Sequence, residues 1–118
     1  MIRSVTILGS TGSIGRQTID VCRQFAIPVV GLACNRSVDL LLEQMALCRP
    51  TRVAVADPAA ATEVREVIRS NNWPVLLLAG ADAAEQLAAS TEAELLVQAM
   101  VGMSGIRPVC SGLLSGHD

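Results

Sequence analysis

Aromatic side chains are almost missing from this chain of 118 residues. Phe25 and Trp73 are the only two, and there is no tyrosine. A protein that binds single-stranded nucleic acid by stacking bases needs several aromatic residues on one surface. The formal net charge is −2, and the basic residues form no run that could follow a phosphate backbone. We therefore expect no nucleic-acid partner.

Long apolar runs are also missing, and none approaches the ~20 residues that a membrane-spanning helix needs. A strand-like apolar run begins already at Val5. It is not preceded by the basic segment, long apolar segment and cleavage site of a secretory signal. We therefore expect neither secretion nor a membrane partner.

The cysteines form no CxxC pair, and His117 is the only histidine, so the spacing typical of a zinc site is absent. The cysteines lie in apolar stretches, where a reduced thiol acts as a small apolar side chain. Reduced cysteines are typical of the cytoplasm, where we expect this protein. The four cysteines are Cys22, Cys34, Cys48 and Cys110.

Small aliphatic side chains are what the chain has in excess. Hydrophobic residues make up 51% of it, mainly Ala, Val, Leu and Ile. Short apolar runs alternate with segments whose apolar residues recur at helical spacing. We predict strands at residues 5–8, 27–33, 53–55, 75–79 and from 95–97 toward 100–102, and helices at residues 16–25, 38–48, 58–70, 81–90 and 106–114.

Two of these helices carry clear signals at their ends. Ser37 can cap the second helix, and Asp57 followed by Pro58 is a typical helix start. Asn71 and Asn72 are expected to end that third helix. The apolar positions predicted for the core side of the second helix are Leu40, Leu41, Met45 and Leu47 or Cys48.

The alternation of strands and helices predicts an α/β fold. Its mainly parallel sheet would be doubly wound and Rossmann-like, in three layers, with helices on both faces. We expect one domain over residues 1–118. Another strand should follow the last predicted helix, but the sequence ends at Asp118. We therefore expect a fragment whose domain is incomplete at the C-terminus and truncated before its next strand.

A glycine-rich stretch joins the first predicted strand to the first predicted helix. Gly9, Gly12 and Gly15 give the spacing GxxGxxG, which differs from the commonest dinucleotide pattern GxGxxG. Glycines let a backbone turn tightly and approach an anion closely, and the N–H groups of the following helix turn favour negative charge. We predict a phosphate-binding loop, with a ligand-free tight turn as the alternative. Hydroxyl donors are added by Ser10, Thr11 and Ser13.

The end of the second predicted strand indicates which nucleotide would bind. An NAD-binding unit has an acidic residue there for the ribose hydroxyls, but no acid occurs here between Asp20 and Asp39. The strand is followed instead by Asn35, Arg36 and Ser37, which suit a 2′-phosphate in charge and geometry. This favours NADP(H) over NAD(H), with an exposed cation as the alternative role of Arg36.

The loop from Gln98 to Gly102, which includes Ala99 and Met100, should pass near the nicotinamide, because ligands bind at the carboxyl ends of parallel strands. The alternative interpretation of these residues is an ordinary strand end with no role at the ligand. We find no catalytic set of serine, histidine and aspartate, no paired carboxylates in a site loop and no cluster of metal ligands. The catalytic residues and metal ligands are therefore expected outside this chain.

The eleven residues from Val5 to Gly15, VTILGSTGSIG, closely resemble the N-terminus of the 1-deoxy-D-xylulose 5-phosphate reductoisomerase family. Supporting similarity continues through Leu32-Ala33-Cys34-Asn35-Arg36-Ser37-Val38, Leu42-Glu43-Gln44 and Met100-Val101-Gly102-Met103-Ser104-Gly105. The resemblance implies an oxidoreductase that depends on NADPH and a divalent metal, Mg or Mn. Such an enzyme converts that sugar phosphate to 2-C-methyl-D-erythritol 4-phosphate in non-mevalonate isoprenoid biosynthesis.

The resemblance also implies roles for particular residues. The loop of Gly9, Ser10, Thr11, Gly12, Ser13 and Ile14 would hold the NADPH pyrophosphate and ribose. Asn35, Arg36 and Ser37 would hold the 2′-phosphate, although the family often has Asn at the position of Ser37. Ala99 and Met100 would pack near the nicotinamide.

Several parts of the family's pattern are absent from this chain. They are the Asn-Lys-Glu motif, the Asp-Ser-Glu metal site, the flexible substrate-covering loop and the C-terminal helical domain. The resemblance therefore implies a cofactor-binding portion without catalytic or metal residues, inactive alone, of an enzyme that is usually a homodimer.

Two other classes of protein remain open on the sequence. One is another NADP-dependent dehydrogenase, such as an extended short-chain dehydrogenase or a semialdehyde dehydrogenase. The former usually has a Tyr-x-x-x-Lys pair, and this chain contains neither residue type. The other is a non-enzymatic nucleotide-binding regulatory module.

Overall fold

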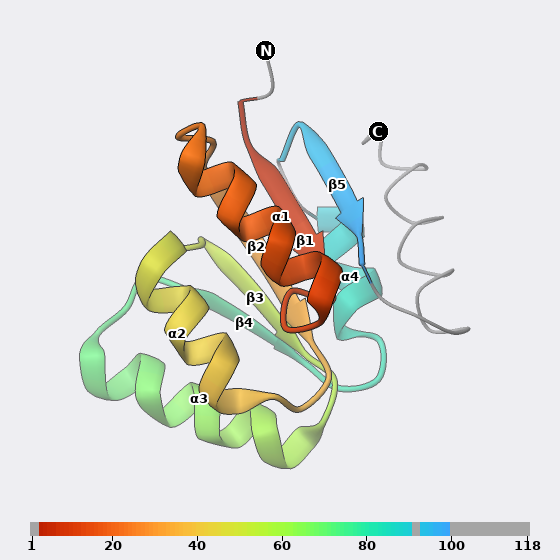
Figure 1. The fold of residues 1–118 in the computed structure, drawn as a ribbon. Helices are drawn as coiled ribbons and strands as arrows, with labels where there is room; N and C mark the ends of the chain where they lie inside the picture. The colour runs from red at the N-terminus through yellow and green to blue at the C-terminus, as the bar shows by residue number, and fades with distance from the viewer. Residues whose placement is uncertain (1–2, 91–92, 100–118) are drawn as a thin grey trace.

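The computed structural model describes residues 3–90 and 93–99 (Figure 1). In these residues strands and helices alternate along the chain. The elements are β1 (Val5–Leu8), α1 (Ser13–Gln24), β2 (Val29–Cys34), α2 (Val38–Cys48), β3 (Arg52–Val55), α3 (Pro58–Asn71), β4 (Leu76–Ala79), α4 (Ala83–Ser90) and β5 (Leu95–Gln98).

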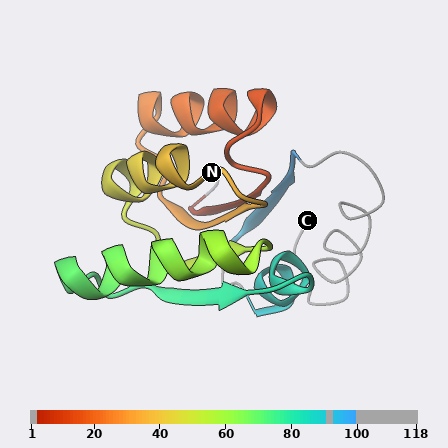
Figure 2. The same cartoon turned by 90° about the horizontal axis from the view of Figure 1, so that it is seen from below.

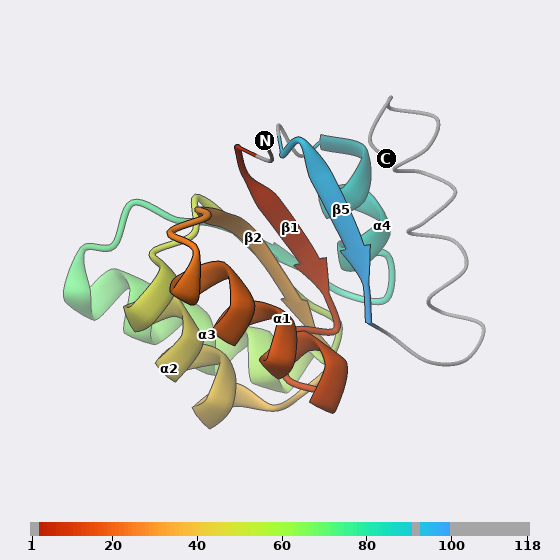
Figure 3. The same ribbon diagram turned by 45° about the horizontal axis from the view of Figure 1, so that its top comes forward.

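The strands form one parallel sheet in the order β4-β3-β2-β1-β5. The chain therefore steps outward from β1 to β4 and then returns across the sheet to place β5 on the other side of β1. Val5 pairs with Val29 of β2 and with Leu95 of β5. Strand β1 therefore lies between β2, the next strand along the chain, and β5, which is far from it in the sequence. Figure 3 shows β1 and β5 side by side and running in the same direction.

The helices cover both faces of the sheet, which explains why the strands are continuous apolar runs. All four residues of β1 are buried. Helices α1, α2 and α3 pack on one face over a large core that includes Ile7, Leu32 and Val53. Helix α4 packs on the other face, where Leu87 meets Leu8 and Ala33. Figure 2 shows these two layers of helices on opposite sides of the sheet.

The helix ends follow from local chemistry. The Asp57 carboxylate accepts a hydrogen bond from the Ala60 N–H at 2.9 Å, and Pro58 opens α3. Asn72 ends α3 in the left-handed conformation, with φ of 52°. Ser37 precedes α2 as predicted, but its side chain accepts no capping hydrogen bond, so that part of the prediction is wrong.

The predicted Rossmann-like α/β class is confirmed, with small shifts at the element ends. β2 begins at Val29 rather than Ile27, because Pro28 has no N–H to donate to a strand ladder. On α2, Leu41 and Met45 are buried as predicted. Of the two alternatives at the end of the helix, Cys48 packs against the core, whereas Leu47 is 55% exposed. The extension of the fifth strand to residues 100–102 and the helix 106–114 lie outside the described residues. No helix in the described part is long and apolar enough to cross a membrane.

We expect Leu87→Ala to lower the free energy of unfolding by about 3 kcal/mol. Leu87 is fully buried and is the largest side chain that α4 contributes to its face of the sheet, so its removal leaves a cavity. Leu47→Ala removes the same atoms from an exposed position of α2 and should change stability by less than about 0.5 kcal/mol. Denaturant unfolding measures both changes. Equal losses of stability in the two variants would contradict the packing of Leu87 between α4 and the sheet.

Candidate functional site

The candidate site lies at the carboxyl ends of the strands, where the order of strands reverses between β1 and β5. The loops that follow β1 and β5 begin next to each other there. The Ala99 N–H donates to the Leu8 carbonyl oxygen at 2.8 Å, which ties the two strand ends together. The loop after β2 opens at the same edge, because all the strands are parallel.

The three glycines of the loop meet three different requirements. Gly9 has a φ of 82°, which residues with a side chain rarely adopt. A Cβ at Gly15 would collide with the Gly9 carbonyl oxygen and would lie 2.7 Å from the Ser10 Cα, so α1 can begin this close to β1 only without a side chain there. Gly12 has an ordinary φ of −80°, and a Cβ would meet only the Gly9 carbonyl oxygen, at 3.6 Å. The fold itself therefore requires Gly9 and Gly15 but leaves Gly12 unexplained.

The backbone hydrogen bonds of this loop leave a defined set of donors. The N–H groups of Gly9 and Ser10 both donate to the Ala33 carbonyl oxygen of β2, each at 2.9 Å. The Gly12 N–H donates to the Gly9 carbonyl oxygen, and the Gly12 carbonyl oxygen accepts from the Arg16 backbone N–H. No acceptor among the described residues takes the remaining N–H groups of the loop and the first turn of α1, those of Thr11, Ser13, Ile14 and Gly15.

The side chains of the loop differ in how far they reach solvent. Ser10 is fully buried, and its hydroxyl has no hydrogen-bond partner in the described structure. Thr11 is half-buried, whereas Ser13 and Ile14 are exposed. The Ser10 carbonyl oxygen accepts a hydrogen bond from the Gln44 side chain of α2 at 2.7 Å. Of the three predicted hydroxyl donors, Ser13 is therefore the most accessible and Ser10 faces the interior.

The loop after β2 exposes all three of its predicted residues, Asn35, Arg36 and Ser37. The Asn35 carbonyl oxygen accepts from the Asp57 N–H, and the Arg36 carbonyl accepts from the Val38 N–H, both at 2.9 Å. These bonds tie the loop to the starts of α3 and α2. Arg36 makes no ion pair within the part of the chain described here.

A cavity of about 580 Å³ opens between the starts of α2 and α3. Among the described residues that line it, Arg36 is the only basic one, and Ala59 and Ala60 give it an apolar wall. Three carboxylates line it too, those of Asp39, Asp57 and Glu63. This mixture of charges could not be predicted from the sequence, since only the fold places the start of α3 beside the loop after β2.

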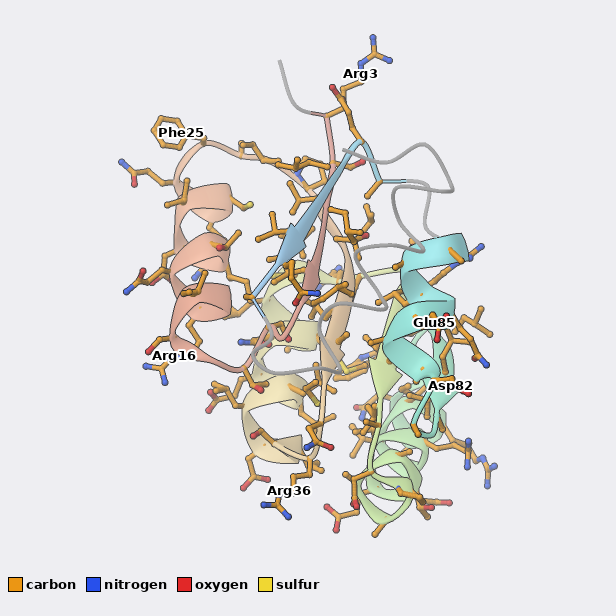
Figure 4. All side chains as sticks on the ribbon, turned by 90° about the vertical axis from the view of Figure 1, so that its right-hand side faces the viewer. Arg3, Arg16, Phe25, Arg36, Asp82 and Glu85 are labelled. Carbon is orange, nitrogen blue, oxygen red and sulfur yellow. The ribbon has the colours of Figure 1, made fainter. Side chains whose placement is uncertain are left out.

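Two further residues of the site have no predicted role. Arg16 lies on the first turn of α1, and Figure 4 shows it toward the same end of the molecule as Arg36, away from Arg3 and Phe25. Its position directly after the third glycine was the available signal. Gln44 faces the core from α2 and contacts the glycine loop, and its buried position could not be read from local spacing.

Cys34 ends β2 and lies at the base of this site. Burial raises the pKa of its thiol from 9.0 to about 11, and a hydrogen bond from the Ser37 backbone partly opposes that shift. The thiol therefore stays neutral at physiological pH. Cys22 and Cys48 are also free thiols, and burial raises the pKa of both.

The remaining predicted positions are placed only in part. Ala99 is half-buried next to the end of β1, and Met100 lies outside the described residues. Within residues 3–90 and 93–99, no three histidine, cysteine, aspartate or glutamate side chains come together as possible metal ligands. The described part therefore offers a loop for an anion but no cluster for a divalent metal.

The parallel sheet, its reversal between β1 and β5, and the glycine loop at that point define a Rossmann-like α/β domain. The family model described as 1-deoxy-D-xylulose 5-phosphate reductoisomerase matches residues 5–118. This chain belongs to that family. The resemblance recognised in the sequence is thereby confirmed.

Individual relatives agree with the family match. The reductoisomerases of Synechococcus sp. and Acaryochloris marina are 39% and 36% identical to this chain over 119 residues. Each comparison covers 99% of this chain and 30% of the relative, so the chain spans about a third of the length of these relatives.

Solved structures show the same fold. The reductoisomerase of Zymomonas mobilis in complex with NADPH is 30% identical, with a TM-score of 0.87 over 99% of this chain and 31% of that one. A DOX-P reductoisomerase in complex with magnesium has a TM-score of 0.90 at 24% identity, over 99% of this chain and 30% of that one.

We expect substitutions at Gly15 and Gly12 to differ in their effect on the free energy of unfolding. Gly15→Ala should lower the free energy of unfolding by more than about 2 kcal/mol, because the new Cβ collides with backbone atoms. Gly12→Ala should change it by less than about 0.5 kcal/mol, since the fold has room for the methyl group. Denaturant unfolding of the two variants tests this, and a strongly destabilised Gly12→Ala chain would show that Gly12 is structural.

The Cys34 thiol should make stability fall with pH in alkaline solution. Its pKa is about 11 in the folded chain and near 9.0 in the unfolded chain, so between these values only the unfolded state loses the proton. Stability is therefore full below pH 9 and declines toward pH 11, by up to about 3 kcal/mol from this group. Unfolding curves of wild type and Cys34→Ala across that range should diverge, and parallel curves would refute it.

Proposed function

We propose that this chain is the NADPH-binding part of a reductoisomerase. The whole enzyme would convert 1-deoxy-D-xylulose 5-phosphate to 2-C-methyl-D-erythritol 4-phosphate. The observation that carries the proposal is the group of unpaired N–H donors on Thr11, Ser13, Ile14 and Gly15, at the sheet's switch point, where the strand order reverses between β1 and β5. Support comes from family membership and from the NADPH in the Zymomonas mobilis structure. The family match also favours this function over another dehydrogenase or a regulatory module.

In this proposal the pyrophosphate is held by backbone rather than by charged side chains. The unpaired N–H groups would donate to the phosphate oxygens, and the positive end of the α1 dipole would favour their negative charge. The open space beside Gly12 fits this role, since a side chain there would occupy the place of the phosphate without disturbing the fold. Gly9 and Gly15 shape the loop, and Ser13 can add a hydroxyl donor.

The 2′-phosphate is proposed to bind at the loop after β2. Arg36 would pair with the phosphate, and Asn35 and Ser37 would add donors. Because the other charged residues lining the cavity are carboxylates, loss of Arg36 would leave the cavity with negative charge only. Ala59 and Ala60 offer an apolar wall that suits an adenine ring. This arrangement predicts a strong preference for NADPH over NADH.

When bound, NADPH would supply the hydride that reduces the rearranged substrate. The role of this chain is to hold the cofactor so that its nicotinamide projects from the switch point, past Ala99 and Met100. A divalent metal, Mg or Mn, would be held by residues outside the described part, as would the catalytic groups. We therefore propose that this chain alone has no activity on the sugar phosphate. Dimerisation of the whole enzyme and a cytoplasmic location stay predictions.

Replacing Arg36 by alanine should weaken NADPH binding by about 10- to 100-fold, because a charge-assisted pair to the 2′-phosphate is lost. Affinity for NADH, which lacks that phosphate, should stay the same. Titration of the purified chain with each nucleotide, followed by calorimetry or nicotinamide fluorescence, measures both constants.

Arg3→Ala is the matched control for this experiment. It removes the same charge from an exposed arginine at the opposite end of the strands (Figure 4) and should leave both affinities unchanged. Equal binding of NADPH and NADH by the wild-type chain, or full NADPH affinity in Arg36→Ala, would overturn the 2′-phosphate assignment. Absence of any nucleotide binding would overturn the proposed function.

A further inference from the structure

A buried polar side chain connects α2 to the glycine loop. Gln44 is only 4% exposed and lies beside Leu41 and Met45 on the side of α2 that faces the core. Its Nε2 donates to the Ser10 carbonyl oxygen at 2.7 Å. The two residues are far apart in sequence, so this bond fixes the position of the loop relative to a different βα unit.

A buried amide at this position stabilises the fold less than an apolar side chain of similar size would. The Gln44 Oε1 atom has no hydrogen-bond partner in the described structure, and neither does the buried hydroxyl of Ser10. Burying such groups unpaired costs free energy, whereas a methionine or leucine would fill similar space without that cost. The single bond that Gln44 does make therefore points to a requirement at Ser10 rather than in the core.

That requirement follows from the geometry of the peptide group. The described residues contain no cis peptide bond, so the Ser10 carbonyl and the Thr11 N–H lie in one peptide plane and point in opposite directions. A bond that holds the Ser10 carbonyl toward α2 therefore turns the Thr11 N–H away from the interior. Thr11 is one of the loop residues whose N–H has no acceptor among the described residues.

We infer that Gln44 is a positioning residue for cofactor binding, which orients the Thr11 N–H toward the NADPH pyrophosphate through the Ser10 carbonyl. This inference rests on the proposed function. Gln44 itself does not touch the cofactor. Its effect should be confined to ligands that carry a pyrophosphate, because the loop after β2 is held by other bonds, from Asp57 and Val38.

The first test uses Gln44→Met, which keeps the length and volume of the side chain but removes the donor. Its affinity for NADPH should fall about 10-fold, as expected for the loss of one buried hydrogen bond. Its affinity for adenosine 2′-monophosphate, which has the 2′-phosphate but no pyrophosphate, should equal that of the wild-type chain. A merely structural role would lower both affinities together. Gln86→Met makes the same exchange at an exposed position of α4 and should change neither.

The second variant, Gln44→Glu, adds a pH profile. An ionised carboxylate cannot donate to the Ser10 carbonyl, but a protonated carboxyl group can. NADPH affinity relative to wild type at the same pH should therefore be low in alkaline solution and recover as the pH falls. A structural defect would not reverse in this way.

The possible failures are distinguishable. If the wild-type chain binds NADPH and both variants bind it equally well, this inference alone is overturned. The same holds if both ligands weaken together, or if neither variant folds, since Gln44 would then be a structural residue of the core. If the wild-type chain binds adenosine 2′-monophosphate but not NADPH, or neither ligand, the proposed function is overturned and the inference with it.

Discussion

The structure depends on one close approach, that of α1 to the end of β1. At Gly15 the helix lies so near the Gly9 carbonyl and the Ser10 Cα that no side chain fits between them. This contact sets where α1 begins, and therefore where its unpaired N–H groups point. Gly9, with its positive φ, makes the turn that allows the approach. Two glycines thus build the loop, and the third, Gly12, keeps one side of it open.

The local parts of this arrangement could be predicted from the sequence. Strand, glycine turn and helix start follow one another within a few residues, and Asp57-Pro58 marks a helix start by itself. The bond from Gln44 to Ser10 could not be predicted, because it joins two βα units and depends on how α2 packs. The same holds for the Ser10 hydroxyl, which was expected at the ligand but is buried. Side-chain direction in a tight turn depends on backbone angles that residue type alone does not determine.

Charge is distributed unevenly along the carboxyl edge of the sheet. In the proposed complex, the attraction for an anion would come from backbone dipoles at β1 and from Arg36 among carboxylates at β2. Such a cavity would repel anions except near the guanidinium, so Arg36 would also restrict where a phosphate binds. The carboxylate of Asp57 has a structural partner in the Ala60 N–H, which explains its presence in this cavity.

The strand order also has a consequence for how the chain reaches its folded state. Strands β2, β3 and β4 each pair with the preceding strand across a single helix, so these contacts close short loops. The pairing of Val5 with Leu95 spans nearly the whole described chain and closes a much longer loop at a higher entropic cost. Non-local pairings of this kind slow folding, so the β1–β5 junction should be completed after the local units. A cofactor bound at that junction would therefore stabilise the contact that costs the chain most conformational entropy.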